Sequence, residues 1–149
     1  MTIEYKINSA SGKIIIEHLF KSADLFFPPL YTYVSIEEYG KKLFEKATNF
    51  EAWHENKLVG LAAAYFNDFT NKIGFWSNLS LLNEYQNQGI ASILASSVIE
   101  YGKNNGFERI ILEVKSKNEK VKKFHEKHGF VKTGQNKDCF IMTYYISSQ

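Results

Sequence analysis

The sequence has few of the residues that mark several common classes of protein. Among its 149 residues the one cysteine, Cys139, cannot form an internal disulfide, and no Cys/His cluster has the spacing of a zinc site. Arg109 is its one arginine, so a site that binds phosphates or carboxylates through several guanidinium groups is not expected. No stretch approaches the roughly 20 apolar residues of a bilayer-spanning helix, and the N-terminus lacks the apolar segment of a signal peptide. These features favour a cytoplasmic globular domain over a secreted scaffold, a membrane protein or a disordered tail.

The charge and composition also limit the partners. A net charge of +2 is too small to indicate a nucleic-acid binder. Lysines are dense over residues 115–127, but Glu113, Glu119 and Glu126 are interleaved with them, which is typical of a solvated helix face. With 44% hydrophobic residues and no repeat or linker, the chain is predicted to be a single domain over residues 1–149.

Hydrophobic periodicity and turn residues predict the order β-α-α-β-β-β-α-β-α-β-β. The expected strands cover residues 2–7, 49–54, 57–66, 73–82, 109–114, 130–133 and 138–146, and the expected helices cover residues 11–23, 36–47, 89–105 and 119–128. Residues 26–33, which hold both prolines, are predicted to form a loop. This order belongs to the α/β class (α+β mixed), with helices flanking a mixed sheet and a β-α-β crossover joining the strands at 73 and 109.

The most informative segment is a strand that runs through a short polar turn into a long helix, over residues 79–91. Such a turn directs backbone N–H groups and the positive end of the helix dipole at one point. A phosphate can bind there without a cationic side chain, and Gly89 would allow it to approach the backbone. The segment is also compatible with an ordinary solvated connection. No dinucleotide or P-loop glycine pattern occurs.

Two motifs in this half of the chain resemble one family. Residues 86–91, QNQGIA, resemble the Q/R-x-x-G-x-G/A signature of the GNAT superfamily of acyl-CoA-dependent N-acetyltransferases. Downstream, Asn118 and the segment FHEKHGF, residues 124–130, resemble the loop asparagine and the F-Y-E-K-x-G-F helix end of the same family. The similarity covers roughly residues 73–134. It implies a central mixed, mostly antiparallel sheet flanked by about four helices.

The resemblance also implies a donor and a site. Acetyl-CoA would be the cosubstrate, with no metal, and an acceptor amine would attack the thioester directly. The Leu81 N–H would polarise the acetyl carbonyl, an interaction that strengthens as charge develops. The residues implied in binding the cofactor are Leu81, Leu82, Gln86, Asn87, Gln88, Gly89, Ile90, Ala91, Ser92, Asn118 and Phe124.

The chain departs from the family pattern at the position of the catalytic acid. Where many members carry a tyrosine that protonates the leaving thiolate, this chain has His125. Histidine titrates near about 6.5 rather than about 10, so only its protonated fraction, or a water, could serve as the acid. We expect His125→Phe to lower kcat about tenfold or more if His125 has this role. The alternative is a histidine that only packs beside Phe124.

The acceptor side carries weaker signals. No general base is evident, and Asp68 and Glu84 are possible but equally compatible with plain solvation. The uncharged aromatic loop at residues 26–33 suits stacking against a sugar or nucleobase, which predicts an amino sugar or a nucleotide-linked amino sugar as acceptor. The residues expected to bind it are Tyr31, Tyr33 and Asn78. The same aromatics are compatible with sealing the core.

Other functions remain open at this level. A protein amine as acceptor, a non-catalytic acyl-CoA-binding or regulatory domain, and a lysine-driven nucleic-acid module are the alternatives. No nucleic-acid or membrane partner is expected, and open edge strands near the C-terminus are compatible with a homodimer.

Overall fold

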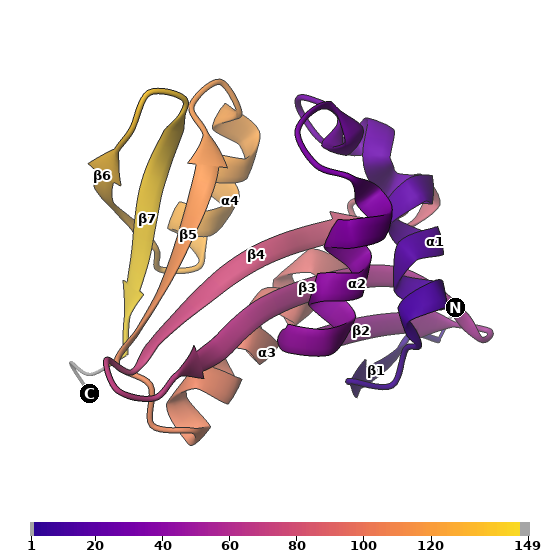
Figure 1. Cartoon of the computed structure of the whole chain (residues 1–149), viewed down its shortest axis with the longest axis horizontal. Helices are drawn as coiled ribbons and strands as arrows, with labels where there is room; N and C mark the ends of the chain where they lie inside the picture. The colour runs from indigo at the N-terminus through magenta and orange to yellow at the C-terminus, as the bar shows by residue number, and fades with distance from the viewer. Residues whose placement is uncertain (1, 147–149) are drawn as a thin grey trace.

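Seven strands form one sheet in the order β1-β2-β3-β4-β5-β7-β6 (Figure 1). The computed structural model describes residues 2–146. The strands are β1 (Glu4–Ile7), β2 (Thr48–His54), β3 (Lys57–Asp68), β4 (Ile73–Leu81), β5 (Arg109–Lys115), β6 (Val131–Gln135) and β7 (Cys139–Tyr145). Neighbouring strands are antiparallel except for β4 and β5, which are parallel. The predicted fold class, a mixed and mostly antiparallel sheet, is confirmed.

Four α-helices cover the two faces of the sheet (Figure 1). They are α1 (Gly12–Ser22), α2 (Ile36–Lys46), α3 (Ile90–Asn104) and α4 (Glu119–Lys127). Helices α1 and α2 pack on one face around a core that includes Leu19, Leu43 and Leu61. Helices α3 and α4 cover the other face, where the larger core includes Leu94 and Trp76. Three short 3-10 helices complete the secondary structure. Ala23–Leu25 directly follows α1, Leu30–Thr32 lies within the predicted loop, and Asn83–Tyr85 forms part of the turn after β4.

A buried carboxylate fixes the start of α1 on the sheet. Glu51, on β2, is 1% exposed and accepts hydrogen bonds from the backbone N–H groups of Ser9 and Ala10 and from Trp53 Nε1, at 3.0–3.1 Å. These donors satisfy a charge that would be costly to bury alone. The contact sets where α1 begins, and therefore where its inner side chains meet β3 and β4.

The four helices do not begin in the same way. The side chains of Ser11, Ser35 and Asn118 cap α1, α2 and α4 by accepting a backbone N–H of the first turn. Helix α3 begins after Gly89, which has no side chain to do so. The first N–H groups of α3, which like those of any helix have no intrahelical partner, therefore also lack the side-chain cap that the other three helices have.

Strands β4 and β5 diverge along their length. They pair only from Ile73 with Arg109 to Trp76 with Leu112, although β4 continues to Leu81 and β5 to Lys115. The separation begins at a bulge, because Ala63 pairs with Asn78 and Ala64 with Trp76, which leaves Ser77 as an extra residue in β4. The two strands open into a V, which Figure 1 shows between the labels β4 and β5.

Candidate active site

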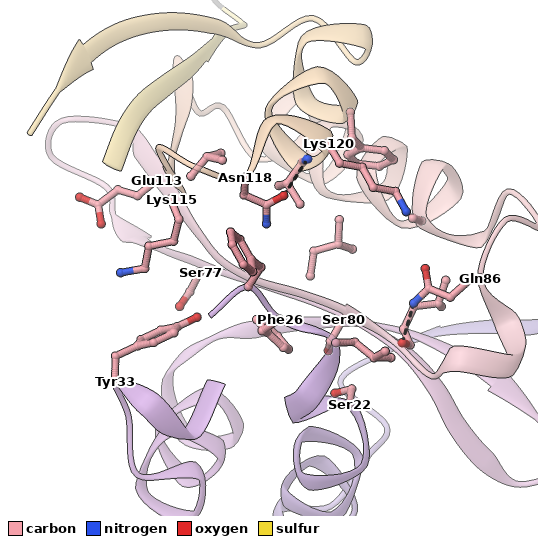
Figure 2. A pocket seen from close by; sticks show the side chains of 18 residues that line it. Ser22, Phe26, Tyr33, Ser77, Ser80, Gln86, Glu113, Lys115, Asn118 and Lys120 are labelled. Atoms are coloured by element: carbon pink, nitrogen blue, oxygen red, sulfur yellow. Dashed lines mark hydrogen bonds between the residues drawn. The ribbon is translucent and has the colours of Figure 1, made fainter. Parts of the chain in front are cut away.

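A cleft of about 450 Å³ occupies the opening between β4 and β5. The α1–α2 connection lies on one side of it and the start of α4 on the other (Figure 2). Its lining residues are Ser22, Leu25, Phe26, Phe27, Tyr33, Ser77, Leu79, Ser80, Leu81, Gln86, Ala91, Glu113, Val114, Lys115, Asn118, Lys120, Val121 and Phe124. The cleft thus collects side chains that are up to 102 positions apart in the sequence, from Ser22 to Phe124.

The edge of β4 that faces the cleft carries a free backbone N–H. Leu82 N–H donates to the Val59 carbonyl at 2.9 Å, and Leu81 pairs with Gly60 one step earlier. Hydrogen-bonded and non-hydrogen-bonded pairs alternate in an antiparallel ladder, so Leu81 directs its N–H and C=O away from β3. The carbonyl accepts a hydrogen bond from Gln86 Nε2, and the N–H is the group left free on the side of the opening toward β5. An extended ligand can pair with this edge as an added strand does.

The turn after β4 places the start of α3 at the end of the same opening. Asn87 and Gly89 adopt left-handed backbone conformations, with φ of 61° and 83°. Asparagine and glycine are the residues that tolerate this region best. Gln86 Nε2 donates to the Leu81 carbonyl at 3.0 Å and ties the turn to the strand (Figure 2). The uncapped N–H groups of α3 are thereby held beside the cleft as a site for an anion.

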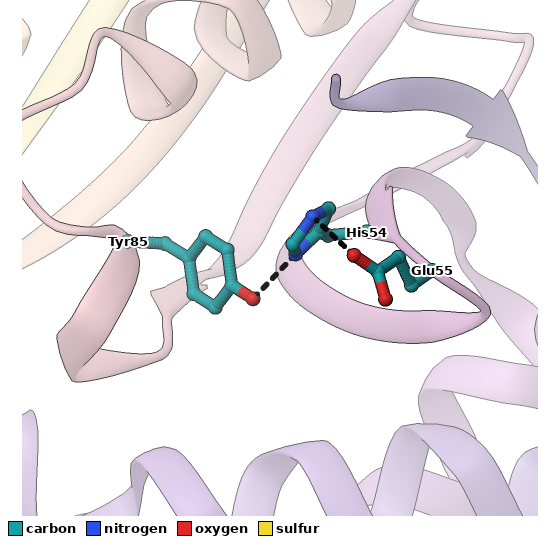
Figure 3. Close-up of polar contacts among 3 residues, drawn as sticks. All are labelled: His54, Glu55 and Tyr85. Atoms are coloured by element: carbon teal, nitrogen blue, oxygen red, sulfur yellow. Dashed lines mark hydrogen bonds and ion pairs between the residues drawn. The ribbon is translucent and has the colours of Figure 1, made fainter. Parts of the chain in front are cut away.

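A polar cluster behind the turn fixes its 3-10 segment. The ring of Tyr85 is buried, and its hydroxyl lies 2.7 Å from His54 Nδ1 (Figure 3). His54 Nε2 lies 3.2 Å from the carboxylate of Glu55. An Nε2–H directed at Glu55 leaves Nδ1 to accept from the tyrosine. The cluster orients Tyr85 and, through it, the first residue of the turn, Gln86.

On the α1 side of the cleft, a buried histidine lies behind a serine of β4. His18 is 2% exposed, and its Nδ1 lies 3.1 Å from the Leu58 carbonyl. Its Nε2 lies 2.8 Å from Ser80 Oγ, which also accepts from Asn78 Nδ2 at 2.9 Å. Burial lowers the pKa of His18 to about 4, although the backbone carbonyls of Leu58 and Ser80 oppose the shift. His18 is therefore neutral at pH 7.

Across the opening, β5 contributes charged side chains. Glu113 is the one carboxylate among the lining residues found in the described part of the chain. Lys115 lies over the ring of Tyr33, with its Nζ 4.5 Å from the ring centroid. This cation–π contact links β5 to the loop that follows α1. Burial raises the pKa of the Tyr33 hydroxyl.

Comparisons with known proteins agree with this geometry. Residues 15–130 match the acetyltransferase (GNAT) family. N-alpha-acetyltransferase 30 of Schizosaccharomyces pombe is 37% identical over 57 residues, which make up 38% of this chain and 38% of that protein. The family match spans more than half of the chain. The chain belongs to the GNAT family of acetyltransferases.

Solved structures support the same fold. PaiA N-acetyltransferase from Thermoplasma acidophilum, in complex with coenzyme A, superposes with a TM-score of 0.78 at 20% identity, covering 97% of this chain and 99% of that one. The ribosomal-protein-S18-alanine N-acetyltransferase from Escherichia coli gives 0.76 at 19% identity, covering 97% and 95%. The predicted family and enzyme class, an acetyltransferase, are confirmed.

The structure brings six of the 15 predicted site residues to the cleft. Those that line it are Tyr33, Leu81, Gln86, Ala91, Asn118 and Phe124. Asn87, Gln88, Gly89 and Ser92 lie in the turn or at the start of α3, whereas Leu82 and Ile90 are buried in the core. Asn78 is also buried and lies beneath Ser80. Their roles toward a ligand remain predictions.

Tyr31 is not among the residues that line the cleft, and its predicted role beside the acceptor stays a prediction. Its side chain is 59% exposed, and its hydroxyl donates to Asp24 at 2.9 Å. The short 3-10 helix at Leu30–Thr32 directs the leucine inward, where it is 2% exposed, and leaves the tyrosine in solvent.

His125 is not among the residues that line the cleft, and its predicted role as the thiolate acid stays a prediction that its surroundings do not support. It is 4% exposed and packs edge-on against Trp76 and Phe130, with ring centroids 4.9 and 5.5 Å away. Burial, with a smaller contribution from the charge of His128, lowers the pKa of His125 to about 4. It therefore has neither contact with the cleft nor a proton to give at pH 7. The alternative, a packed histidine, fits the structure.

Several lining residues were missed by the sequence reasoning. The sequence assigns Glu113 to a solvated charge run, and the bases that it offers as possible, Asp68 and Glu84, are not among the lining residues. The signal was present, because Glu113 is the acidic residue within a β-rich run that pairs with β4. His18, Ser77 and Ser80 had no motif around them, and their proximity comes from the packing of α1 and α2 on the sheet.

Within residues 2–146, no group of three or more His, Cys, Asp and Glu side chains is arranged to hold a metal ion. Across the same residues, no helix combines the length and apolarity that crossing a bilayer requires.

Proposed function

We propose that the chain transfers the acetyl group of acetyl-CoA to a primary amine by direct attack within a ternary complex. The observation that carries this is the opening between β4 and β5, which holds a free strand edge next to the uncapped start of α3. A CoA molecule needs both, because its pyrophosphate requires N–H donors and its pantetheine arm is an extended chain with amides.

Each element has a role in this proposal. The turn at residues 86–91 and Ser92 bind the pyrophosphate through main-chain N–H groups, and the pantetheine arm follows the β4 edge past Phe124 and Asn118. Asn118 Oδ1 caps α4, so its amide nitrogen is the group left for the ligand. The Leu81 N–H donates to the thioester carbonyl, whose oxygen gains charge during attack.

Glu113 is the candidate general base. An amine is mostly protonated at neutral pH and must lose a proton before or during attack. A carboxylate on the wall of the cleft can accept that proton directly or through one water. Since His125 is out of reach, the departing thiolate takes its proton from solvent or from another lining group.

For the acceptor, the α-amine of a polypeptide is our first candidate, because the relative in Schizosaccharomyces pombe is named an N-alpha-acetyltransferase. An amino sugar is the second, because Phe26, Phe27 and Tyr33 give the cleft aromatic surfaces. A domain that only binds acyl-CoA would show cofactor binding without turnover of any amine.

Two measurements test the proposal. Acetyl-CoA and CoA at about 100 times Kd add about 2.7 kcal/mol to the free energy of unfolding, so the Tm rises by several degrees. Thiol release is then followed with a peptide bearing a free N-terminus, with glucosamine and with spermidine, and the same peptide with an acetylated N-terminus is the control. A Tm unchanged at millimolar CoA would refute the cofactor site. A shifted Tm without thiol release from any amine would favour the binding domain.

A further inference from the structure

The contacts of His18 determine which way the Ser80 hydroxyl points. A carbonyl oxygen can only accept a hydrogen bond, so His18 Nδ1, 3.1 Å from the Leu58 carbonyl, carries the ring proton. A neutral imidazole has one such proton, and Nε2 is therefore an acceptor. The 2.8 Å contact between Nε2 and Ser80 Oγ is then a hydrogen bond donated by the serine.

This assignment leaves Ser80 with nothing to donate toward the cleft. Its one hydrogen is directed at His18, and one lone pair accepts from Asn78 Nδ2 at 2.9 Å. Rotating the Asn78 amide would bring its oxygen against the Leu61 carbonyl and remove that donor. The remaining lone pair belongs to an oxygen of a residue that lines the cleft. Ser80 is 5% exposed, and its hydroxyl oxygen has a lone pair, but no hydrogen, left for a ligand in the cleft.

Ser77 has a similar arrangement further along β4. The Tyr39 hydroxyl lies 3.1 Å from the Ser77 carbonyl and 2.7 Å from Ser77 Oγ. Both contacts are hydrogen bonds only if Tyr39 donates to the carbonyl and Ser77 donates to Tyr39. Two hydroxyls on this wall thus have their hydrogens directed away from the cleft, one at the buried His18 of α1 and one at the half-buried Tyr39 of α2. The hydroxyl oxygens of Ser77 and Ser80 are therefore suited to N–H groups and not to carbonyls or carboxylates.

The position of Ser80 indicates which ligand meets it. Ser80 contacts α1, on the face of the sheet opposite to α3, where the proposed pyrophosphate site begins. It also directly precedes Leu81, whose N–H faces the thioester in the proposed function. A group bound to Ser80 therefore approaches the thioester carbon from the side opposite to the cofactor's entry.

We propose that Ser80 is a binding residue for the acceptor, accepting a hydrogen bond from the N–H of the attacking amine, and that His18 is a positioning residue that keeps the serine hydrogen out of the cleft. The inference rests on the proposed function and specifies the acceptor. The nitrogen must carry at least one N–H while bound, so primary amines are accepted and quaternary ammonium groups are not. The bond also holds the nitrogen in a fixed orientation toward the thioester.

The test uses 2-phenylethylamine and its N,N,N-trimethyl derivative as probes, because the phenyl group suits the aromatic lining. Each is titrated by calorimetry into protein saturated with CoA. The wild type should bind the amine at least about tenfold more tightly than the trimethyl derivative, since a hydrogen bond to a charged donor is lost. This comparison needs no variant, so it does not depend on how well a substituted protein folds.

Ser80→Ala should weaken the amine about tenfold and leave the trimethyl derivative unchanged. His18→Phe should have the same effect, because the freed serine hydrogen can then turn into the cleft. Thr143→Val is the control, because it removes a buried hydroxyl whose hydrogen bond to Thr133 lies on β7 and β6. It should match the wild type with both probes.

Equal affinity of the wild type for the two probes, absence of amine binding, or wild-type affinity in Ser80→Ala would overturn the inference. The Tm shift with CoA is measured on the same samples. A missing shift is a failure of the proposed function, whereas a normal shift with any of those results is a failure of the Ser80 inference alone.

Discussion

The two ends of the cleft are built from different parts of the chain. At the cofactor end, one continuous segment supplies the strand edge, the turn and the start of α3, and it acts mainly through backbone groups. At the acceptor end, side chains from α1, the following loop, β4 and β5 meet only because the sheet brings them together. A short sequence motif can encode local backbone geometry. It cannot encode a site whose side chains come from several distant elements.

The ends also differ in what they offer a ligand. The cofactor end presents N–H donors, from Leu81 and from the uncapped first turn of α3. The acceptor end presents hydrogen-bond acceptors, namely the Glu113 carboxylate and the hydroxyl oxygens of Ser77 and Ser80. Donors suit phosphates and a developing oxyanion, and acceptors suit an amine. A substitution at one end should therefore affect one substrate and spare the other.

The largest effect should come from Glu113→Gln. Removing a general base lowers kcat by about 100-fold or more, because the amide cannot take the amine proton. The Tm shift with acetyl-CoA should stay at the wild-type value, since Glu113 belongs to the acceptor end. Thiol release and thermal denaturation check the two parts.

Glu126→Gln, on the exposed face of α4, is the control for loss of a negative charge and should keep the wild-type kcat. A Glu113→Gln enzyme with undiminished kcat would exclude this carboxylate as the base.

His125→Phe should separate stability from catalysis, because His125 belongs to neither end. With a pKa of about 4 in the folded state and about 6.5 when unfolded, the unfolded chain takes up the proton first as the pH falls. Stability is therefore constant above pH 6.5 and falls toward pH 4, by an amount on the order of 3 kcal/mol for this group. His18 adds a second contribution of the same sign.

The phenylalanine variant should lose less stability than the wild type between pH 7 and pH 4.5, as measured by urea denaturation. It also removes Nδ1, which has no hydrogen-bond partner within the described residues. Its kcat at pH 7 should remain close to that of the wild type, which reverses the expectation from the sequence. A tenfold fall in kcat with unchanged stability would restore a catalytic role.

The fold was predictable because its signals are local. The serines before α1 and α2, the glycine before α3 and the hydrophobic periodicity of the strands each act within a few residues. Boundaries differed by a residue or two where caps decide them. The turn before α3 was predictable for the same reason, since the left-handed conformations at Asn87 and Gly89 depend on those two residues.

The acceptor end was not predictable from local patterns. His18 looks like one more residue on the inner face of α1, and only its contact with Ser80, 62 positions away, gives it a partner. For His125 the local motif predicts a catalytic position, but contacts made in the folded chain determine its surroundings. Trp76 and Phe130 pack against its ring and bury it. Burial by distant aromatic residues leaves no signature in the motif itself.

Gly89→Ala should sharpen the difference between the ends. At a φ of 83° an alanine costs about 1–2 kcal/mol, and its Cβ would stand in the open space above the turn, where no atom lies within 4 Å. The affinity for CoA should fall about tenfold, and the affinity for 2-phenylethylamine should not change. Calorimetry measures both.

Gly106→Ala is a matched control, because Gly106 has a φ of 77° and equally open surroundings but lies beyond the other end of α3. It should lose the same stability and keep the CoA affinity. An equal loss of CoA affinity in both variants would show that strain, and not the approach of the ligand, explains the Gly89 result.

The smallest effect should come from Lys115→Met, which removes the cation above Tyr33 and keeps the aliphatic stem. An exposed cation–π contact contributes about 0.5–1 kcal/mol, so the KM for the acceptor should rise only a few-fold as the loop after α1 loosens. The affinity for CoA should not change. Lys132→Met is the control, because Lys132 lies over Phe140 at a similar distance, 4.3 Å, on β6 and outside the cleft. An unchanged acceptor KM in both variants would show that the packing of the loop on α1 and α2, and not its contact with Lys115, holds the loop in position.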